Sequence, residues 1–446
     1  MWIPQLKPST KPKYLALADA IAYAIETGEL KAGDRLPPQR QLAWKLGINP
    51  STTMLAYREA TRRHLIGGET GRGTYVLDGS KEASLFLIKQ PKQSNQYFDL
   101  STNIPAIDIN NQDIQQTLAY LIQAEQLNDT QGYLTTQNCT LGQIMIAKWL
   151  GLRSIQCQPS QIKLCAGAQQ GLFITLSSLC KMGDPILVES FTAPGIKAAA
   201  HQLHLPLYGI AMDQDGIIPT DLDRLIRTTS AKIIVLTPSL QNPTANTMNK
   251  QRQQEIAQVI LKHHIVLIED DVYGALTQQP PLCALLPEHS ILISSFSKTV
   301  AAGLRVGYIV ASTNLLQHID PEAHLSHWAV SPLDLKIISH WIENGTAKNR
   351  LDWQYKQVES RWHLARKILG KNLLKAQQPS PHIWLAVPFA SPKLSDLCQQ
   401  EKISVVPAEV FSVGKQHLNA IRISLTAAKN LVELKIALEN IKKLIS

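Results

Sequence analysis

A chain of 446 residues is too long for one ordinary hydrophobic core, so its length predicts two or three domains. Its composition, 44% hydrophobic and 18% charged, excludes a disordered or low-complexity protein. The formal net charge of +9 weakly favours a polyanionic partner, and the first 79 residues are more basic than the remainder.

The first 79 residues predict three helices and a hairpin. Apolar periodicity and turn residues predict, in chain order, a helix over 14–27, a short helix over 38–46, a tight turn at 47–49, a helix starting at Pro50 and two short strands ending at 74–76. Asn49 is the expected N-cap of the third helix, because its side chain can accept from a free N–H of the first turn. We expect that helix to direct Leu55, Ala56 and Ala60 inward.

Polar and basic residues in this segment suggest contacts with DNA. A helix that reads DNA offers polar side chains in its first turn, and an arginine at a narrow hairpin tip can enter the minor groove. The candidates are Arg40, Ser51, Thr52, Thr53, Arg72 and Gly73. The same pattern also occurs in helix-turn-helix units that serve only packing.

Four short segments of this region, LPPQRQLA (36–43), LGIN (46–49), AY (56–57) and GRGTYV (71–76), resemble the GntR family of regulators. The resemblance implies a winged helix-turn-helix DNA-binding domain over residues 1–79, with double-stranded operator DNA as its partner. Residues 80–97 have little periodicity and are expected to be a linker.

From residue 98 the pattern changes to short apolar runs that alternate with helical stretches. The predicted strands are 162–165, 186–189, 233–237, 265–269, 291–294 and 306–310. Strands separated by helices predict a mostly parallel α/β sheet, and the part after about residue 332 is expected to be helical and then α+β.

The strongest chemical signal is the sequence SFSK, which ends at Lys298. A lysine that forms a Schiff base must sit on a rigid element, and the strand predicted just before it provides one. Ser295 and Ser297 are small enough for a phosphate group to approach, and Arg305, seven residues after the lysine, can bind that phosphate with two hydrogen bonds.

Other strand ends carry residues suited to the same cofactor. Pyridoxal phosphate acts as an electron sink when a carboxylate keeps its ring nitrogen protonated, and Asp270 follows an apolar strand where α/β proteins bind ligands. Tyr273 and Asn242 are candidates for hydrogen bonds to the phenolic ring oxygen. Arg422, on a late strand, suits a substrate carboxylate, although a structural salt bridge would also explain it.

Small residues at a strand-to-helix junction complete the predicted phosphate site. Gly167, Ala168 and Gln169 begin a predicted helix, whose first N–H groups can bind phosphate. Such junctions occur throughout α/β proteins, so this motif is weak without the others.

In this order and spacing, the motifs resemble the fold-type I, aspartate aminotransferase-like enzymes over residues 98–446. A GntR-like segment joined to such a domain resembles the MocR family of bacterial regulators. The resemblance implies a multidomain α/β protein, a pyridoxal 5'-phosphate cofactor on Lys298, and a homodimer in which Tyr133 reaches the partner's phosphate. It also marks a departure: the usual stacking aromatic is replaced by Ala193, so that Phe191 is the remaining candidate to stack on the cofactor ring.

Three functions fit these expectations. The chain is a regulator whose aminotransferase-like domain binds pyridoxal phosphate, as cofactor or signal, together with an amino acid or amine. Alternatively, it is a working aminotransferase with an appended DNA-binding domain, or a DNA-binding protein whose second domain is only a dimerisation scaffold.

The remaining signals concern location. The six cysteines form no C-x-x-C pair, which argues against a metal knuckle or a disulfide framework. The sequence has neither a signal-peptide pattern nor a run of 18 apolar residues. We therefore expect a cytoplasmic protein that has free thiols, no metal site and no membrane span.

Overall fold

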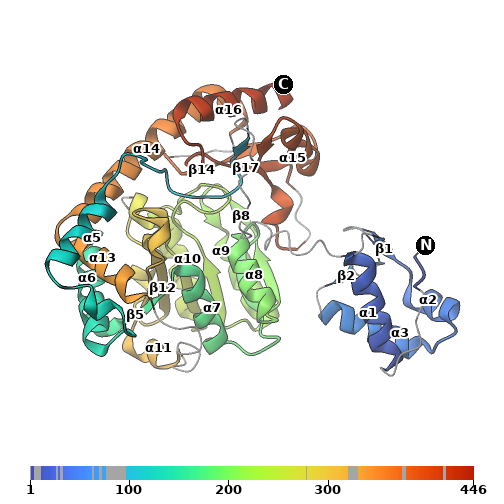
Figure 1. The fold of residues 1–446 in the computed structure, drawn as a ribbon. Coiled ribbons are helices and arrows are strands. Elements are labelled where there is room, and N and C mark those ends of the chain that lie inside the picture. Colours follow the sequence, from blue (N-terminus) through green and yellow to red (C-terminus); the bar gives the residue numbers. More distant parts are fainter. Residues whose placement is uncertain are drawn as a thin grey trace. The chain divides into compact units, whose positions relative to one another are not determined.

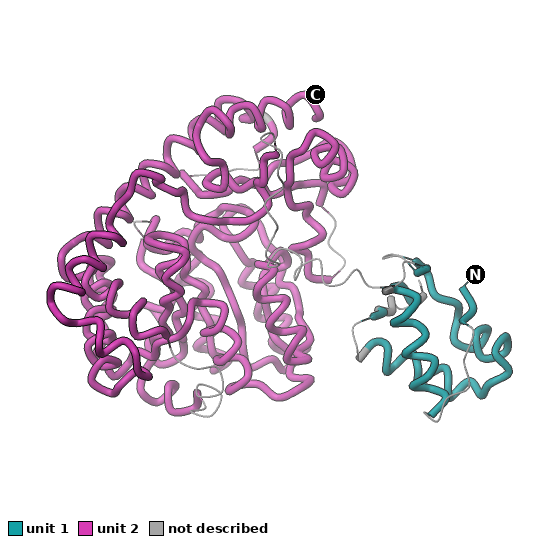
Figure 2. The backbone as a smooth tube through the Cα atoms, in the orientation of Figure 1, with its two compact units in different colours: residues 1–89 teal, residues 90–446 magenta. Residues whose placement is uncertain are grey.

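The structure is a computed structural model that describes residues 2–4, 12–26, 29–30, 34–62, 65–69, 73–76, 97–277, 279–319, 330–373, 378–414 and 418–445. The chain divides into two compact units, Met1–Lys89 and Gln90–Ser446 (Figure 2). No helix among the described residues is both long enough and apolar enough to cross a membrane.

In its described residues the first unit consists of three helices and a small antiparallel sheet (Figure 1). Its elements are α1 (Lys13–Glu26), β1 (Arg35–Leu36), α2 (Gln39–Leu46), α3 (Pro50–Arg62), β2 (Ile66–Glu69) and β3 (Gly73–Val76). The strand order is β1-β3-β2, and the sequence analysis missed β1. The turn between α2 and α3 uses Gly47 in the left-handed conformation, with a φ of 60°. Asn49 Oδ1 accepts from the N–H of Ser51 at 2.9 Å, so its predicted capping role is confirmed.

The inward face of α3 differs from the prediction. Thr53, Ala56, Tyr57 and Ala60 are buried, and their spacing of three, four and seven residues defines one helical stripe. Leu55 lies off this stripe and is 41% exposed, so its predicted inward position is wrong.

The second unit is built on a seven-stranded sheet with the order β5-β13-β12-β11-β10-β6-β7. The strands are β5 (Ile162–Cys165), β6 (Ile186–Glu189), β7 (Leu207–Ile210), β10 (Ile233–Leu236), β11 (Val266–Asp270), β12 (Ser290–Ser295) and β13 (Gly307–Ala311). Only β13 runs antiparallel to its neighbours. All six predicted strands are present to within one residue at either end, whereas β7 was not predicted.

Alternate residues of the strands bury themselves against helices on both faces. Val188, Val235 and Ile268 pack with α7 and α8, whereas Leu187 and Leu267 face α9 and α10 (Figure 1). The helices of this layered core are α5 (Asp113–Gln123), α6 (Thr136–Gly151), α7 (Ala168–Leu179), α8 (Pro194–Gln202), α9 (Pro219–Thr229), α10 (Lys250–His263), α11 (Thr313–Gln317) and α13 (Pro332–Glu343).

The C-terminal part forms a second, three-stranded antiparallel sheet with the order β14-β17-β16. Its elements are α14 (Thr346–Leu369), β14 (His382–Ala386), α15 (Ser391–Gln400), β15 (Ile403–Ser404), β16 (Val406–Pro407), β17 (Ala420–Ser424) and α16 (Leu431–Ile445). One face of this sheet is apolar and packs in a core with α14 and α16. The other face carries His382, Trp384 and Arg422, because Trp384 pairs directly with Arg422 across the strands. β15 also pairs with β4 (Phe98–Asp99), which ties the start of this unit to its C-terminal part.

Candidate functional site

Six strands of the large sheet run in the same direction and end at one edge. The chain that leaves them leads to Gly167 after β5, Phe191 after β6, Asn242 after β10, Asp270 at the end of β11 and Lys298 after β12. Ligands of open α/β sheets bind at this carboxyl edge, so the topology gathers predicted residues from distant parts of the sequence.

Lys298 ends the short turn η5 (Phe296–Lys298), directly after β12. Its Nζ donates a hydrogen bond to the backbone oxygen of Asn103. Burial and the nearby charges of Arg422 and Arg305 lower the pKa of Lys298 to about 8, against the opposing effect of Asp270. An amine with this pKa is neutral in about a tenth of the molecules at pH 7, so it is a better nucleophile than a surface lysine.

Asp270 ends β11, where the N–H of Val272 lies 3.4 Å from its Oδ1. Burial raises the pKa of Asp270 to about 6, and the charge of Lys298 works in the opposite direction. The carboxyl group is therefore mostly ionised at neutral pH, and it can stabilise a positive charge on a bound ligand.

A glycine-lined cradle lies between the start of α7 and Arg305. Gly167 precedes α7 with a φ of 89°, and the helix begins without a side-chain cap. A Cβ at Gly167 would lie 2.6 Å from Arg305 Nη2, and the positive φ disfavours other residues, so glycine here lets the guanidinium lie against the backbone. Arg305 Nη1 donates to Ser297 Oγ at 3.0 Å, while Ser295 is buried at the end of β12. Uncapped helix N–H groups, a guanidinium and two hydroxyls suit a phosphate group.

The neighbouring residues Ala168 and Gln169 begin α7. Ala168 has no hydroxyl to add to the cradle, and Gln169 Nε2 donates to the backbone oxygen of Gly195 at 2.8 Å. Gln169 thus connects α7 to α8 through its side chain.

Arg422 is 4% exposed and lies beside Asn242. It donates to Asn242 Oδ1 at 3.1 Å and to the backbone oxygen of Ser101, both of which are neutral acceptors. Its Nε is buried without a partner, and burial lowers the pKa of Arg422 to about 10. A buried cation held by neutral oxygens favours an anionic ligand. Because Asn242 accepts through Oδ1, its Nδ2 remains as a donor.

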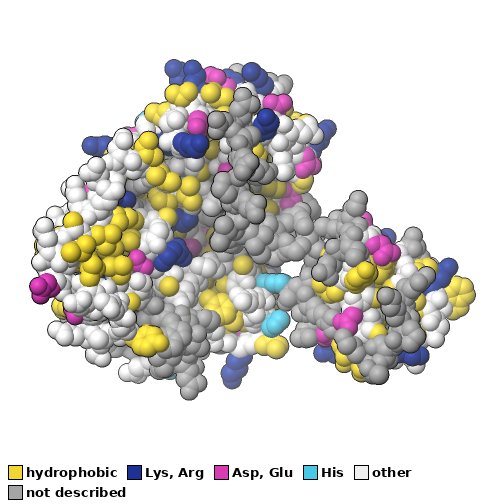
Figure 3. All heavy atoms as spheres, viewed as in Figure 1, with side chains coloured by type: hydrophobic (Ala, Val, Ile, Leu, Met, Phe, Trp, Pro, Cys, Tyr) yellow, Lys and Arg dark blue, Asp and Glu magenta, His cyan; other side chains and the backbone are white. Residues whose placement is uncertain are grey.

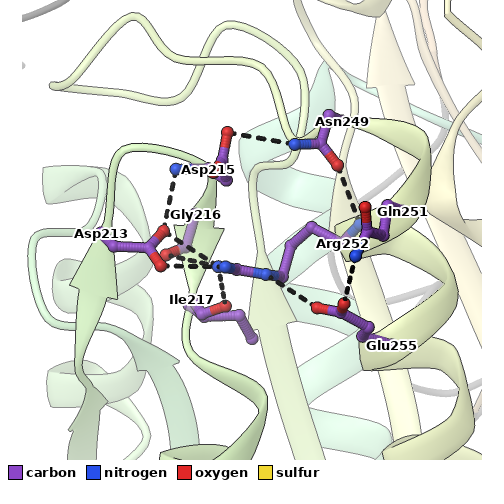
Figure 4. A network of polar contacts seen from close by, with 8 residues as sticks. All are labelled: Asp213, Asp215, Gly216, Ile217, Asn249, Gln251, Arg252 and Glu255. Carbon is purple, nitrogen blue, oxygen red and sulfur yellow. Dashed lines mark hydrogen bonds and ion pairs between the residues drawn. The ribbon is translucent and has the colours of Figure 1, made fainter.

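The segment from Asn242 to α10 is anchored by a polar network (Figure 4). Asn249 caps α10 by accepting from the N–H of Arg252 at 2.9 Å, and it donates to Asp215 at 3.0 Å. Arg252 binds both carboxylate oxygens of Asp213 at 2.9 Å. These bonds hold the hairpin of β8 (Met212–Asp213) and β9 (Gly216–Ile217) against α10.

An aromatic cluster surrounds Arg422. Phe411 lies under its guanidinium, 5.1 Å from ring centroid to Cζ, and packs edge-on against Trp384. The ring centroids of Phe191 and Trp384 are 6.0 Å apart, and the angle between the ring planes is 58°. Ala193 is buried among the residues of the α7 and α8 core.

The structure also reveals buried polar residues that the sequence analysis missed. Asp271, next to Asp270, forms a buried ion pair with Arg153. Asn103 and His382 hydrogen-bond each other beside Tyr273. Glu189 accepts from the N–H of Thr237 at 2.7 Å, and burial raises its pKa to about 8. The sequence signal for Asp271 was its position in tandem with Asp270.

The predicted DNA contacts in the first unit are only partly accessible. Arg40 and Ser51 are exposed and Thr52 is half-buried. Thr53 is 0% exposed, so its side chain belongs to the core and its prediction as a DNA contact is corrected. Gly73 is the first residue of β3. Arg72 lies outside the described residues.

Comparison with known protein families assigns both parts of the chain. Residues 95–441 match aminotransferase class I and II, and residues 13–76 match the bacterial regulatory proteins of the gntR family. The chain belongs to the aminotransferase class I and II family. With its GntR helix-turn-helix it has the MocR architecture, and pyridoxal 5'-phosphate is the cofactor that this family implies.

Two bacterial relatives match this chain over nearly their whole length. The HTH-type transcriptional regulator YdeF of Bacillus subtilis is 26% identical over 450 residues, covering 100% of this chain and 96% of its own. YdcR of Escherichia coli, also named an HTH-type transcriptional regulator, is 25% identical and covers 90% and 92%. An aromatic amino acid aminotransferase of Schizosaccharomyces pombe is 26% identical, over 56% of this chain and 61% of its own.

Solved structures confirm the fold of this MocR protein. An archaeal alanine:glyoxylate aminotransferase superposes with a TM-score of 0.75 at 20% identity, covering 87% of this chain and 98% of its own. The multiple substrate aminotransferase of Thermococcus profundus gives 0.72 at 19% identity, covering 82% and 96%. Together with the gntR family match over residues 13–76, these structures confirm the expected winged helix-turn-helix plus fold-type I domain.

The described residues of this MocR protein fit the implied cofactor. The uncapped start of α7 and the close approach of Arg305 to Gly167 suit its phosphate. The lowered pKa of Lys298 suits attack on its aldehyde, and the ionised carboxylate of Asp270 suits its protonated ring nitrogen. Ala168 has no hydroxyl to offer the phosphate, and Ala193 has no ring to stack on the cofactor.

Proposed function

We propose that this protein is a pyridoxal phosphate-dependent transcription regulator. Its first unit binds operator DNA, and its second unit binds the cofactor, as cofactor or signal, together with an amino acid or amine. The observation that carries the proposal is the presence of both sites in one chain: exposed Arg40 and Ser51 on a winged helix, and Lys298 beside Asp270 in a cofactor cradle. We place it in the cytoplasm, where DNA is accessible, and cell fractionation tests this.

Each residue around the cofactor has a distinct proposed role. Bound pyridoxal phosphate supplies an electron sink for reactions at the carbon next to an amino group. Lys298 holds it covalently, Asp270 keeps its ring nitrogen protonated, and Tyr273 and Asn242 donate to its phenolic oxygen. The proposed phosphate ligands are Gly167, Ala168, Gln169, Ser295, Ser297 and Arg305. Phe191 is the proposed stacking aromatic.

Arg422 is the proposed binding residue for the carboxylate of the effector. Its buried guanidinium has two neutral partners and an unpartnered Nε, so an incoming carboxylate gains a strong charge-assisted hydrogen bond. An effector that prefers one domain arrangement shifts the population of that arrangement, which changes DNA binding.

A homodimer is the proposed assembly. Hydrophobic side chains gather on the surface over α5, α6 and α13, and α5 and α6 both pack on α13 (Figure 3). Exposed apolar residues of α5, α6 and the segment before them include Ile107, Ile109, Ile114, Tyr120, Ile122, Leu141 and Ile144. A contiguous apolar patch of this kind is typical of a subunit interface. Tyr133, 78% exposed before α6, is the proposed ligand of the partner's phosphate. Sedimentation analysis tests this assembly, and a particle of one chain mass, 49.4 kDa, would contradict it.

The cofactor should change DNA binding by this protein. We expect genomic fragments selected by the cofactor-loaded protein to bind with an affinity or footprint that differs from those of the cofactor-free protein, because the ligand favours one arrangement. Lys298→Ala should lose this response while still binding DNA. Identical titrations and footprints with and without pyridoxal phosphate, in protein shown to be loaded, would contradict the regulatory role.

Arg40→Ala should weaken DNA binding by about tenfold. Arg40 is exposed in the first turn of α2, so its replacement should cost little stability. Lys45→Ala, in the last turn of the same helix, removes the same charge from another exposed position and should have a smaller effect. Fluorescence anisotropy with a selected fragment at fixed salt measures both affinities. Equal affinity of Arg40→Ala and the unmodified protein would show that α2 does not contact DNA.

Aminotransferase activity is the second candidate function. Lys298, Asp270, Tyr273 and Arg422 are all present and adequate for the reaction, and the aminotransferase of Schizosaccharomyces pombe is one of the relatives. Spectra recorded with a panel of amino acids and keto acids distinguish the two functions. Steady turnover supports aminotransferase activity. If no amino donor gives a half-reaction, the result supports a purely regulatory domain.

A further inference from the structure

A chain of buried hydrogen bonds connects Gln241, His382, Asn103 and Tyr273. His382 Nε2 lies 3.0 Å from the backbone oxygen of Gln241, and His382 Nδ1 lies 3.1 Å from Asn103 Nδ2. The same Nδ2 donates to the hydroxyl of Tyr273 at 2.9 Å. All four residues are at most 6% exposed, so water does not compete for these bonds. Neither Asn103 nor His382 has a role in the proposed function.

The donor and the acceptor of each of these hydrogen bonds follow from the backbone carbonyl of Gln241, at one end of the series. A backbone carbonyl only accepts, so His382 must donate to it from Nε2. Burial and the positive charges of Arg422 and Lys298 lower the pKa of His382 to about 3, so the ring is neutral and its Nδ1 carries no proton. Asn103 must then present its amide N–H to Nδ1, which directs its second N–H to Tyr273.

The hydroxyl of Tyr273 therefore acts as an acceptor towards Asn103. Because its oxygen accepts that bond, its own proton must be donated in another direction. Burial raises the pKa of Tyr273 to about 12, so this proton is retained at neutral pH.

We propose that Asn103 and His382 are positioning residues that keep the Tyr273 proton available to the phenolic oxygen of the cofactor. The inference rests on the proposed role of Tyr273. It extends the site to two residues that do not touch the cofactor, and it gives a reason for a histidine that is 0% exposed on the otherwise aromatic face of β14.

The pH titration of the visible absorbance of the loaded protein tests this inference. A donor to the phenolic oxygen stabilises the form with more negative charge on that oxygen, which is the deprotonated form of the Lys298 linkage. A weaker donor therefore moves the titration midpoint upward. We expect Asn103→Leu, which removes both amide donors, to raise the midpoint by about 0.5 to 1 pH unit.

Two further variants and a control separate positioning from packing. Asn103→Asp offers only acceptors, captures the Tyr273 proton and should give the largest upward shift. His382→Phe keeps an aromatic ring beside Tyr273 but lets the Asn103 amide turn, so it should shift the midpoint in the same direction. Ile383→Val trims the opposite, apolar face of β14, removes no hydrogen bond and should leave the midpoint unchanged. The charged groups facing Tyr273 and His382, which are Asp270, Arg422 and Lys298, are kept in every variant.

The outcomes are distinguishable from failure of the proposed function. If the unmodified protein gains no visible absorbance with pyridoxal phosphate, the proposed cofactor chemistry itself is wrong. If it does, and Asn103→Leu and His382→Phe remain folded and loaded with an unchanged midpoint, the positioning role is overturned. If one of these two variants fails to fold, the other decides the result by the same criterion.

Discussion

We expect Lys298→Ala to abolish covalent attachment of pyridoxal phosphate and the visible absorbance that accompanies it. The amine of Lys298 is held at the carboxyl edge of the sheet with a pKa near 8, and this combination of position and reactivity distinguishes it from surface lysines. The phosphate cradle at Gly167 and Arg305 remains in the variant, so residual non-covalent binding should persist. Absorbance spectra and equilibrium dialysis measure the two effects separately.

A matched control for this variant is Lys163→Ala. Lys163 lies on β5, is half-buried and donates to the backbone oxygen of Ile319 at 2.9 Å, so it resembles Lys298 in burial and bonding but lies outside the cluster. Its replacement should leave the absorbance intact. A visible band that survives Lys298→Ala would place the covalent linkage on another amine.

The tandem acids at the end of β11 should respond oppositely to substitution. Asp271 forms a buried pair with Arg153, so Asp271→Asn leaves a buried guanidinium without its counter-charge and should lower the free energy of unfolding by about 3–5 kcal/mol. The pKa of Asp270 is higher in the folded protein than in the unfolded chain. Its ionised form therefore lowers the stability of the fold at pH values above the pKa of the unfolded chain. Asp270→Asn should therefore leave the stability of the cofactor-free protein unchanged or slightly higher.

For cofactor affinity, Asp270→Asn should have a larger effect than Asp271→Asn. Asp270→Asn removes the charge that holds the ring proton and should weaken pyridoxal phosphate binding by about 30-fold or more. Denaturant unfolding of the cofactor-free protein and cofactor titration measure the two quantities. Replacing Arg153 by methionine and Asp271 by leucine together should recover most of the lost stability, because apolar side chains can replace a buried pair. If Asp270→Asn and Asp271→Asn changed the free energy of unfolding and the cofactor affinity by equal amounts, the distinction between the two acids would be refuted.

Much of this site could be predicted because its residues directly follow apolar strands. Lys298, Asp270 and Gly167 each come at the end of a short run whose burial is visible in the sequence. Parallel strands share one carboxyl edge, so the gathering of these residues follows from the order of strands alone.

The remaining features depend on contacts that no local pattern encodes. Asn103 lies 279 positions before His382, and Arg153 lies 118 before Asp271, so their pairing is set by packing between distant segments. In α3 the helical period was clear, yet the inward stripe includes Thr53 and excludes Leu55. Helical spacing predicts how wide the buried face of α3 is. Which side of the helix is buried depends on how α1 and α2 pack against it.

The residue that carries the cofactor can be identified chemically. Borohydride reduction of the protein saturated with pyridoxal phosphate fixes the linkage, and peptide mass spectrometry then identifies the modified residue. We expect one pyridoxyl group per chain, on Lys298. A modification spread over exposed lysines, with Lys298 unmodified, would contradict it.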